Sequence, residues 1–216
     1  MNRRTIPTIF TVVFLVLALA LPSGARAGLE EGASAFIRDL ADEAVQSLTG
    51  KDVSRDERIK RFRQMFRNNF AVRSIGKFAL GRIARGRSWR NAGVADKNAY
   101  FQTFEDHVVI SYVDRFARYA GEKLQVTKAR TENQQILTVF SKIERAGGVK
   151  PIRIHWQLAT NGKIFKVLDV FIEGASMSKT FQDTFGAIYR NEGRSMAGLL
   201  DAIRTKTAEM NARADQ

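Results

Sequence analysis

The spacing of apolar residues changes abruptly near Gly121, and this change constrains the fold more than any other feature of the chain. Before it, apolar residues recur every three or four positions, as in amphipathic helices. From Leu124 to Glu173 they alternate with period two, as in strands, and afterwards the helical spacing returns. This order predicts an α+β fold, with a helical N-terminal half, a central sheet and C-terminal helices packed together.

Four strands are expected in the central segment, and they span residues 124–128, 136–143, 152–159 and 164–172. The links between them contain Glu132-Asn133, Gly147-Gly148 and Asn161-Gly162. Asn-Gly is a strong signal for a tight hairpin, because both turn positions favour positive φ. Links this short join neighbouring antiparallel strands, so we expect a four-stranded meander.

The helices are marked by apolar stripes and by signals at their ends. Ser54 and Glu57 have the spacing of a capping box, in which each side chain satisfies a free amide of the other residue. Gly81–Gly93 is expected to be a basic loop. The expected helices cover about residues 33–48, 55–70, 75–80, 96–119, 178–191 and 195–210.

The N-terminus has the three parts of a secretory signal peptide. Arg3 and Arg4 precede an uncharged apolar run, Ile9–Leu21, and the small-residue site Ala25-Arg26-Ala27 follows. The run is shorter than the roughly 20 residues that span a bilayer, although an uncleaved anchor is the alternative. We therefore expect cleavage after Ala27 (residues 1–27) and a single soluble domain over residues 28–216.

The amino-acid composition limits the cellular compartments and the kinds of partner that we expect. The chain has no Cys, which excludes disulfides and thiol chemistry and favours a bacterial periplasm. Without the three Arg residues of the leader, 32 basic residues face 22 acidic ones, a net charge of +10. Outside the cytoplasm nucleic acid is not the expected partner. We expect lipid headgroups, lipopolysaccharide or acidic proteins instead. The alternative is that the positive charge only keeps the surface solvated.

No catalytic or metal-binding constellation is evident. His107 and His155 lie on different predicted elements, and neither has a second ligand at metal spacing. Ser176 and Lys179 match the Ser-x-x-Lys spacing of penicillin-recognising enzymes, but the companion motifs are absent in the expected order. The other interpretation is that Ser176 caps the following helix. We expect no enzyme, cofactor or metal, with a small Ser-Lys hydrolase as the alternative.

The chain has more apolar surface than one sheet face requires. It contains 15 Phe, and the last predicted strand, Ile164–Ile172, is apolar on both faces in places. A sheet with helices on one face needs only one apolar face. Either the terminal helices cover the second face, or a cavity between sheet and helices takes an apolar ligand.

Specific residues indicate a family. The last strand and its turn read Phe165-Lys166-Val167-x-Asp169-Val170-x-Ile172-Glu173-Gly174-x-Ser176, which is the most specific run. Weaker matches are Leu80-Gly81, Trp89-Arg90, Phe101-x-x-Phe104, Tyr119-x-Gly121 and Leu199-Leu200. From about Phe36 to Lys206 the chain resembles the MlaC family of periplasmic phospholipid carriers, also called toluene-tolerance auxiliary proteins. It departs from the family pattern at Arg82–Ser88, which lengthen a link, and at Phe165, where Trp is common.

The resemblance implies a mixed α+β fold with a deep apolar pocket for acyl chains. It also implies a monomer that shuttles phospholipid between an outer-membrane lipoprotein complex and the lipid-binding subunit of an inner-membrane ABC transporter, and so maintains outer-membrane lipid asymmetry. A hopanoid-associated branch, HpnM, shares the pattern, so a hopanoid-related lipid is the alternative cargo.

Two sets of candidate site residues follow. We expect the basic stretch Arg82, Arg85, Arg87 and Arg90 to meet an acidic partner or anionic headgroups. On the last strand, Val170 is expected to face the pocket with Leu168 and Ile172, away from Asp169 and Glu173. The full set expected to contact lipid is Phe66, Phe70, Phe78, Phe104, Val108, Tyr112, Val139, Trp156, Leu168, Val170 and Ile172.

Overall fold

The computed structural model describes residues 23–119, 121–145, 147 and 149–214. Most of the predicted signal peptide lies outside these residues, so its cleavage stays a prediction. The elements follow the order expected from the apolar spacing. They are α1 (Ser23–Leu48), α2 (Arg55–Asn69), α3 (Val72–Leu80), η1 (Ile83–Arg85), α4 (Arg87–Asn91), α5 (Val94–Ala117), β1 (Lys123–Thr131), β2 (Ile136–Glu144), β3 (Ile152–Thr160), β4 (Phe165–Ile172), β5 (Ala175–Ser176), α6 (Met177–Asn191) and α7 (Met196–Ala214).

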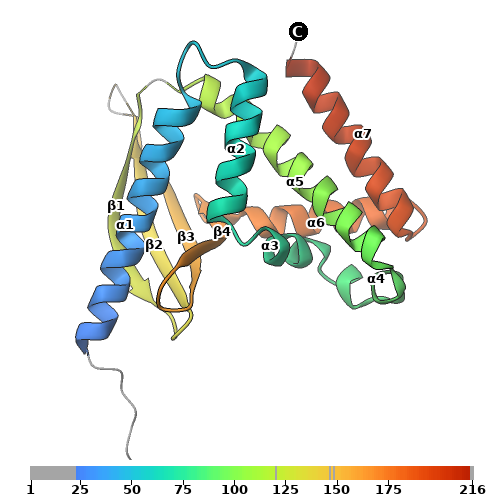
Figure 1. Cartoon of the computed structure of the whole chain (residues 1–216), viewed down its shortest axis with the longest axis horizontal. Coiled ribbons are helices and arrows are strands. Elements are labelled where there is room, and N and C mark those ends of the chain that lie inside the picture. The colour runs from blue at the N-terminus through green and yellow to red at the C-terminus, as the bar shows by residue number, and fades with distance from the viewer. Residues whose placement is uncertain (1–22, 120, 146, 148, 215–216) are drawn as a thin grey trace, which may run out of the picture.

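The strands form one antiparallel sheet in the order β1-β2-β3-β4-β5, so each strand pairs with its neighbour in the chain (Figure 1). The expected count of four strands was one short, because the two-residue β5 pairs with the end of β4. The register shifts between Val126 and Lys128 on β1, and again where β3 pairs with β4 at Gln157 and Leu158. Such bulges move side chains to the opposite face and increase the local twist.

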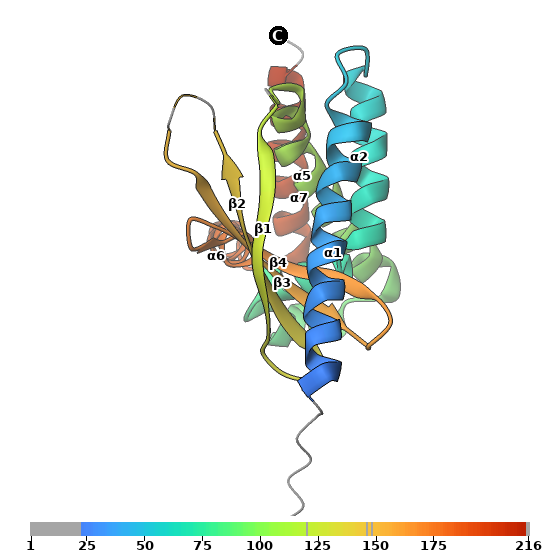
Figure 2. The same cartoon turned by 90° about the vertical axis from the view of Figure 1, so that its left-hand side faces the viewer.

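Helices cover one face of the sheet. Helix α1 lies along β1 and β2, and α2 reaches β4 on the same side (Figures 1 and 2). Of the terminal helices, α6 packs mainly against α3 and also contacts β4, and α7 packs against α5. Among the described residues they therefore leave the second face of β1, β2 and β3 without a covering helix, contrary to one of the two expected arrangements. On that face the half-buried Phe140 contacts the ring of His155 at 4.6 Å, and Lys128 Nζ lies 4.7 Å from the Phe140 ring centre.

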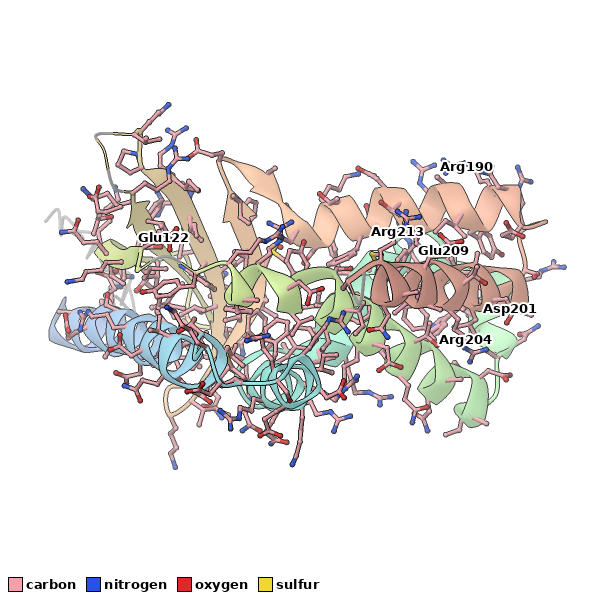
Figure 3. The ribbon with its side chains drawn as sticks, turned by 90° about the horizontal axis from the view of Figure 1, so that it is seen from above. Glu122, Arg190, Asp201, Arg204, Glu209 and Arg213 are labelled. Carbon is pink, nitrogen blue, oxygen red and sulfur yellow. The ribbon has the colours of Figure 1, made fainter. Side chains whose placement is uncertain are left out.

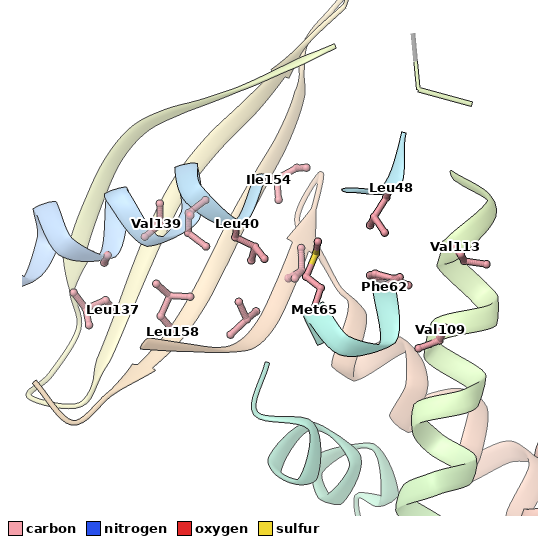
Figure 4. Packing of buried hydrophobic residues seen from close by; sticks show 14 residues of the cluster. Leu40, Leu48, Phe62, Met65, Val109, Val113, Leu137, Val139, Ile154 and Leu158 are labelled. Atoms are coloured by element: carbon pink, nitrogen blue, oxygen red, sulfur yellow. The ribbon is translucent and has the colours of Figure 1, made fainter. Parts of the chain in front are cut away.

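A first hydrophobic core lies between α1, α2, α5 and the covered face of the sheet. Figure 4 shows Leu40 and Leu48 of α1, Phe62 and Met65 of α2, and the strand residues Val139, Ile154 and Leu158 directed toward one another. The inward strand residues alternate with exposed or half-buried ones, as the period-two pattern predicts.

A second hydrophobic core is entirely helical. It joins α3, η1, α4, α5, α6 and α7 with Phe66 of α2, through fully buried rings such as Tyr100, Phe104 and Phe185. The Tyr100 hydroxyl donates to the carbonyl oxygen of Gly76 at 2.7 Å, so its polar end is satisfied. Phe70 and Tyr112 pack against both cores and mark the boundary between them.

Charged contacts fix α2 against α5 between the two cores. The Arg55 guanidinium donates to both carboxylate oxygens of Asp114, at 2.9 and 3.2 Å. Farther along the helix, Arg63 and Arg67 both donate to Glu105, which is only 8% exposed. Charge-assisted pairs with this paired geometry hold both position and orientation.

Two local predictions were wrong in detail. Gly81–Gly93 is not a continuous loop, because Ile83 and Trp89 are buried anchors and the residues around them form η1 and α4. The capping box at α2 is only half formed. Ser54 Oγ accepts from the Glu57 amide at 3.2 Å, but the Glu57 carboxylate accepts from Arg61 instead. Within the described part of the chain, no helix is long and apolar enough to cross a membrane.

His107 gives the α5–α7 contact a pH dependence. It is 5% exposed, and its Nδ1 lies 2.9 Å from Thr207 Oγ1. Burial, with a smaller contribution from the nearby Lys206 charge, lowers the pKa of His107 to about 4. The unfolded chain therefore takes up this proton near its ordinary pKa of about 6.5, before the folded chain does.

We expect the free energy of unfolding to fall as pH drops from about 6.5 to 4, with His107 contributing up to about 3 kcal/mol of that loss. Thermal melting of the wild type and of His107→Gln across this range measures the contribution. The variant should show a shallower decrease. An identical slope in both proteins would contradict the assignment.

Candidate ligand cavity

A cavity of about 750 Å³ lies between α1, α2, the C-terminal end of α5 and the covered face of β1, β2 and β3. It adjoins the first hydrophobic core and opens to solvent where α1 ends, α5 ends and β1 begins. The second core and α3, α4, α6 and α7 contribute no lining residue. The cavity is thus a feature of the sheet half of the molecule.

The interior of the cavity is apolar. Two rings pack at its side, with Phe62 and Phe116 centroids 5.1 Å apart. The apolar residues lining it are Leu40, Ala41, Ala44, Val45, Phe62, Met65, Phe70, Phe116, Leu124, Ile143, Ile152, Ile154 and Trp156.

The polar groups near the sheet wall are satisfied. Trp156 Nε1 donates to Ser141 Oγ at 3.0 Å, and Ser141 Oγ donates to the Ile154 carbonyl oxygen at 3.0 Å. Buried donors that are paired in this way carry little penalty, and none of these needs a ligand as partner. The wall therefore suits an apolar ligand better than a polar one.

The remaining lining residues are polar, and most of them are exposed. They come from α1, from the turn between α5 and β1, and from the end of β2. They are Arg38, Asp42, Thr49, Arg115, Arg118, Tyr119, Glu122, Lys123 and Arg145. We call this set the mouth of the cavity. An apolar interior with a charged rim fits an amphipathic ligand whose polar end stays in water.

The residues predicted to contact lipid are spread over several environments. Only Phe70 and Trp156 line the cavity. Val139 and Val170 are buried in the first core, and Ile172 packs against it. Phe66, Phe104 and Val108 lie in the second core, and Tyr112 touches both cores. Phe78 is 50% exposed and lies in neither core.

The placement of Leu168 differs from the prediction for a local reason. Leu158 pairs with Val167 and Gln157 pairs with Asp169, so Leu168 is the extra residue of a bulge. Val167 and Val170 then share the covered face, whereas Leu168 belongs to neither core. Strict alternation cannot reveal a bulge, because one inserted residue reverses the face of everything before it.

The prediction omitted most of the lining residues, including the large ones Phe62, Met65 and Phe116 and the small residues on α1. Ala41 and Ala44 lie on the side of α1 that faces the sheet, beside Leu40. An Ala on a stripe otherwise made of large apolar residues leaves space opposite it, and a cavity remains if nothing else fills that space. The Ala residues in the stripe from Phe36 to Leu48 were therefore a readable signal.

The basic stretch lies far from the mouth. Arg82, Arg85, Arg87 and Arg90 are all exposed, on and around η1 and α4, and we call them the basic end. Trp89 of α4 packs on Tyr100 near the start of α5, whereas Phe116 near its end lines the cavity. Sixteen residues of helix separate these contacts by about 24 Å. Ser88 also bonds Tyr189 of α6 at 2.9 Å. Figure 3 shows Glu122 of the mouth and Arg190 of α6 at opposite ends of the molecule.

The Ser-x-x-Lys sequence forms a helix cap. Ser176 Oγ accepts from the Lys179 amide at 2.9 Å and donates to the carboxylate of Asp169. The Lys179 ammonium pairs with Asp183 one turn along α6. Asp169 also accepts from the amides of Val170 and Ser178, at 2.8 and 3.0 Å, which compensates its burial. These contacts join β4 to α6, and the Lys179 ammonium is engaged by Asp183 rather than by Ser176 Oγ.

The two His residues do not form a site together. His107 is buried between α5 and α7, and His155 lies on the uncovered face of the sheet. Among the residues described, no group of three His, Cys, Asp or Glu side chains could hold a metal ion.

The chain is similar to known proteins over most of its length. The family model described as MlaC protein matches residues 38–205, more than three quarters of the chain. A solved structure described as a phospholipid-binding protein from Ralstonia solanacearum, in complex with a phospholipid, superposes with a TM-score of 0.71. The two sequences are 16% identical, and the match covers 83% of this chain and 98% of the other. At that identity the likeness establishes a shared fold.

The cavity predicts opposite outcomes for two bulky substitutions. Ala44→Trp places a ring in empty space and should change the free energy of unfolding only by its lower helix propensity, about 0.7 kcal/mol or less. Val170→Trp overpacks the first core and should cost about 1–3 kcal/mol. Thermal melting compares both with Gln46→Trp, on the exposed side of α1, as the control. Equal losses for Ala44→Trp and Val170→Trp would show that Ala44 faces packed atoms.

Proposed function

Since the chain belongs to the MlaC protein family, we propose that it is a soluble periplasmic carrier that binds one phospholipid, with the acyl chains in the cavity beneath α1. The observation that carries this proposal is the combination of an apolar interior with a charged mouth. The solved phospholipid complex of the Ralstonia solanacearum protein, which shares the fold, supports it.

A lipid carrier needs such a cavity because exposing acyl chains to water costs much free energy. Each CH₂ group moved from water to an apolar site gains about 0.8 kcal/mol, so free acyl chains cannot cross an aqueous compartment at useful concentration. A carrier must cover both chains and leave the headgroup solvated. The lining of the cavity supplies the first property, and the polar residues of the mouth supply the second.

The membership also supports a role in transport. We propose that the protein takes phospholipid between an outer-membrane lipoprotein complex and the lipid-binding subunit of an inner-membrane ABC transporter, and thereby maintains outer-membrane lipid asymmetry. The predicted signal peptide and the absence of Cys, the usual site of a lipid anchor, are consistent with movement through the periplasm. Family and cavity point to binding and transport rather than to catalysis, and Ser176 is engaged as a helix cap.

The basic end fits a partner better than it fits the cargo. A headgroup at the mouth lies about 24 Å along α5 from Trp89, too far for contact with Arg82 or its neighbours. We propose that these four Arg residues meet an acidic surface of a partner protein during delivery. Exposed charges of this kind mainly accelerate association.

Lipid retention tests the carrier function directly. We expect the natively purified protein to hold about one diacyl phospholipid per chain, identified by mass spectrometry of its organic extract. The same measurement separates a glycerophospholipid from a hopanoid-related cargo. Ala44→Trp should come out folded with several-fold less lipid, and Gln46→Trp should be unaffected. An extract free of lipid from folded wild type would contradict the proposal.

The basic end should affect transfer and leave cargo binding intact. Replacing its four Arg residues with Gln should slow lipid transfer to inner-membrane fractions several-fold at low salt, because steering by exposed charge weakens as salt screens it. Lipid content per chain should not change. The control removes four other exposed cations, Lys60, Lys163, Arg204 and Arg213. Equal slowing in the control would show that only the net charge matters, and would contradict a specific role for the basic end.

A further inference from the structure

We propose that the mouth of the cavity selects phospholipids whose headgroup carries a net negative charge over those whose headgroup is zwitterionic. This inference rests on the proposed carrier function and names the class of cargo. It is carried by the charges that line the mouth, and by how few of them are paired within the protein.

The mouth has an excess of positive charge. Five cations line it, Arg38, Arg115, Arg118, Lys123 and Arg145, against two carboxylates, Asp42 and Glu122, for a net charge of +3. The cations come from α1, the end of α5, β1 and the end of β2, so they approach the opening from several sides. A net charge that surrounds the rim of an apolar cavity acts on whatever polar group occupies that rim.

Four of these five cations make no ion pair within the described part of the chain. Arg38 pairs with Glu31 at 3.0 Å, and Arg145 Nε donates to the Lys150 carbonyl oxygen at 3.0 Å. Arg115, Arg118 and Lys123 form no ion pair with a described carboxylate, and the carboxylate of Asp114, next to Arg115 in the chain, pairs with Arg55. The guanidinium of Arg115 lies over the Tyr112 ring, 4.9 Å from its centre, which positions the charge without neutralising it.

One contact joins the described residues between α5 and β1. The Tyr119 hydroxyl donates to the Glu122 carbonyl oxygen at 2.7 Å. The amide of Arg118 bonds back to the carbonyl oxygens of Arg115 and Phe116 and ends the helix. Arg118 and Lys123 thus flank the Tyr119–Glu122 contact at the opening.

The helix end does not account for the charge. Cations near a helix C-terminus are stabilised by its dipole, which is equivalent to about half a negative charge. That partial charge could balance at most one of Arg115 and Arg118, and it leaves Lys123 and the excess from the other elements. The excess is therefore available to a ligand.

The positive charge of the mouth predicts which headgroups are favoured. Phosphatidylglycerol and phosphatidylethanolamine each bring one phosphate, which the mouth cations can bind. In a zwitterionic headgroup the attached ammonium meets the same positive field and is repelled. Phosphatidylglycerol has no such cation, so its headgroup gains the attraction without the repulsion.

Competition between two lipids tests the proposal. The purified protein is incubated with excess vesicles of equal moles of phosphatidylglycerol and phosphatidylethanolamine with identical acyl chains, then repurified and extracted. We expect bound phosphatidylglycerol to exceed phosphatidylethanolamine by about threefold or more at low salt, and the ratio to fall toward one at about 1 M salt, where the Debye length is about 3 Å.

A matched pair of variants removes the effect of net charge. The mouth variant carries Arg115→Gln, Arg118→Gln and Lys123→Gln, and the control carries Lys60→Gln, Arg204→Gln and Arg213→Gln, on exposed faces of α2 and α7. Both lose three positive charges and should adsorb equally to anionic vesicles. The enrichment should disappear in the mouth variant and persist in the control.

The outcomes separate this inference from the proposed function. Bound lipid at a ratio near one in the wild type, or equal loss of enrichment in both variants, overturns the charge selection while the carrier function stands. Folded wild-type protein that takes up neither lipid overturns the carrier function itself. Thermal melting of both variants confirms that each is folded, since all six substituted side chains are exposed.

Discussion

Charged contacts hold α2, which forms one side of the cavity, against α5. Arg55, Arg63 and Arg67 reach carboxylates of α5, and Arg58 donates to the Leu48 carbonyl oxygen at the end of α1 at 2.7 Å. An empty volume lined by apolar groups loses dispersion contacts, so a flexible layer would collapse into it. These directional contacts hold α2 in place against α5 and the end of α1 and so oppose such a collapse, and α5 also packs in the second core.

The period of the apolar residues predicted most of the fold, because each period follows from backbone geometry alone. The turn between β3 and β4 is a feature that the apolar period did not predict correctly. Gly162 has positive φ as expected, but Asn161 does not, and its side chain accepts from the amides of Lys163 and Ile164 to form a wider turn. Likewise β5, α4 and the bulge at Leu168 depend on tertiary contacts that the local sequence does not encode.

The candidate site was harder to predict than the fold. Phe66, Phe104 and Phe185 are as apolar as Phe62 and Phe116, yet the first three fill a closed helical core and the last two reach the cavity. Apolar character identifies buried residues and cannot distinguish a packed core from a void. The absence of volume at Ala41 and Ala44 carries that information, and it is meaningful only once the element opposite is known.

The most specific sequence run, from Phe165 to Ser176, has a structural role that explains its residue types. Asp169 binds two amides and the Ser176 hydroxyl, and the turn places Glu173 and Gly174 at φ of 50° and 86°. Glu173 then pairs with Arg153 of β3 at 3.0 Å. This run fixes the direction in which α6 leaves the sheet, and α6 with α3 supports the basic end. The mouth of the cavity and the basic end thereby lie at opposite ends of α5, so the proposed cargo and the proposed partner would use separate surfaces.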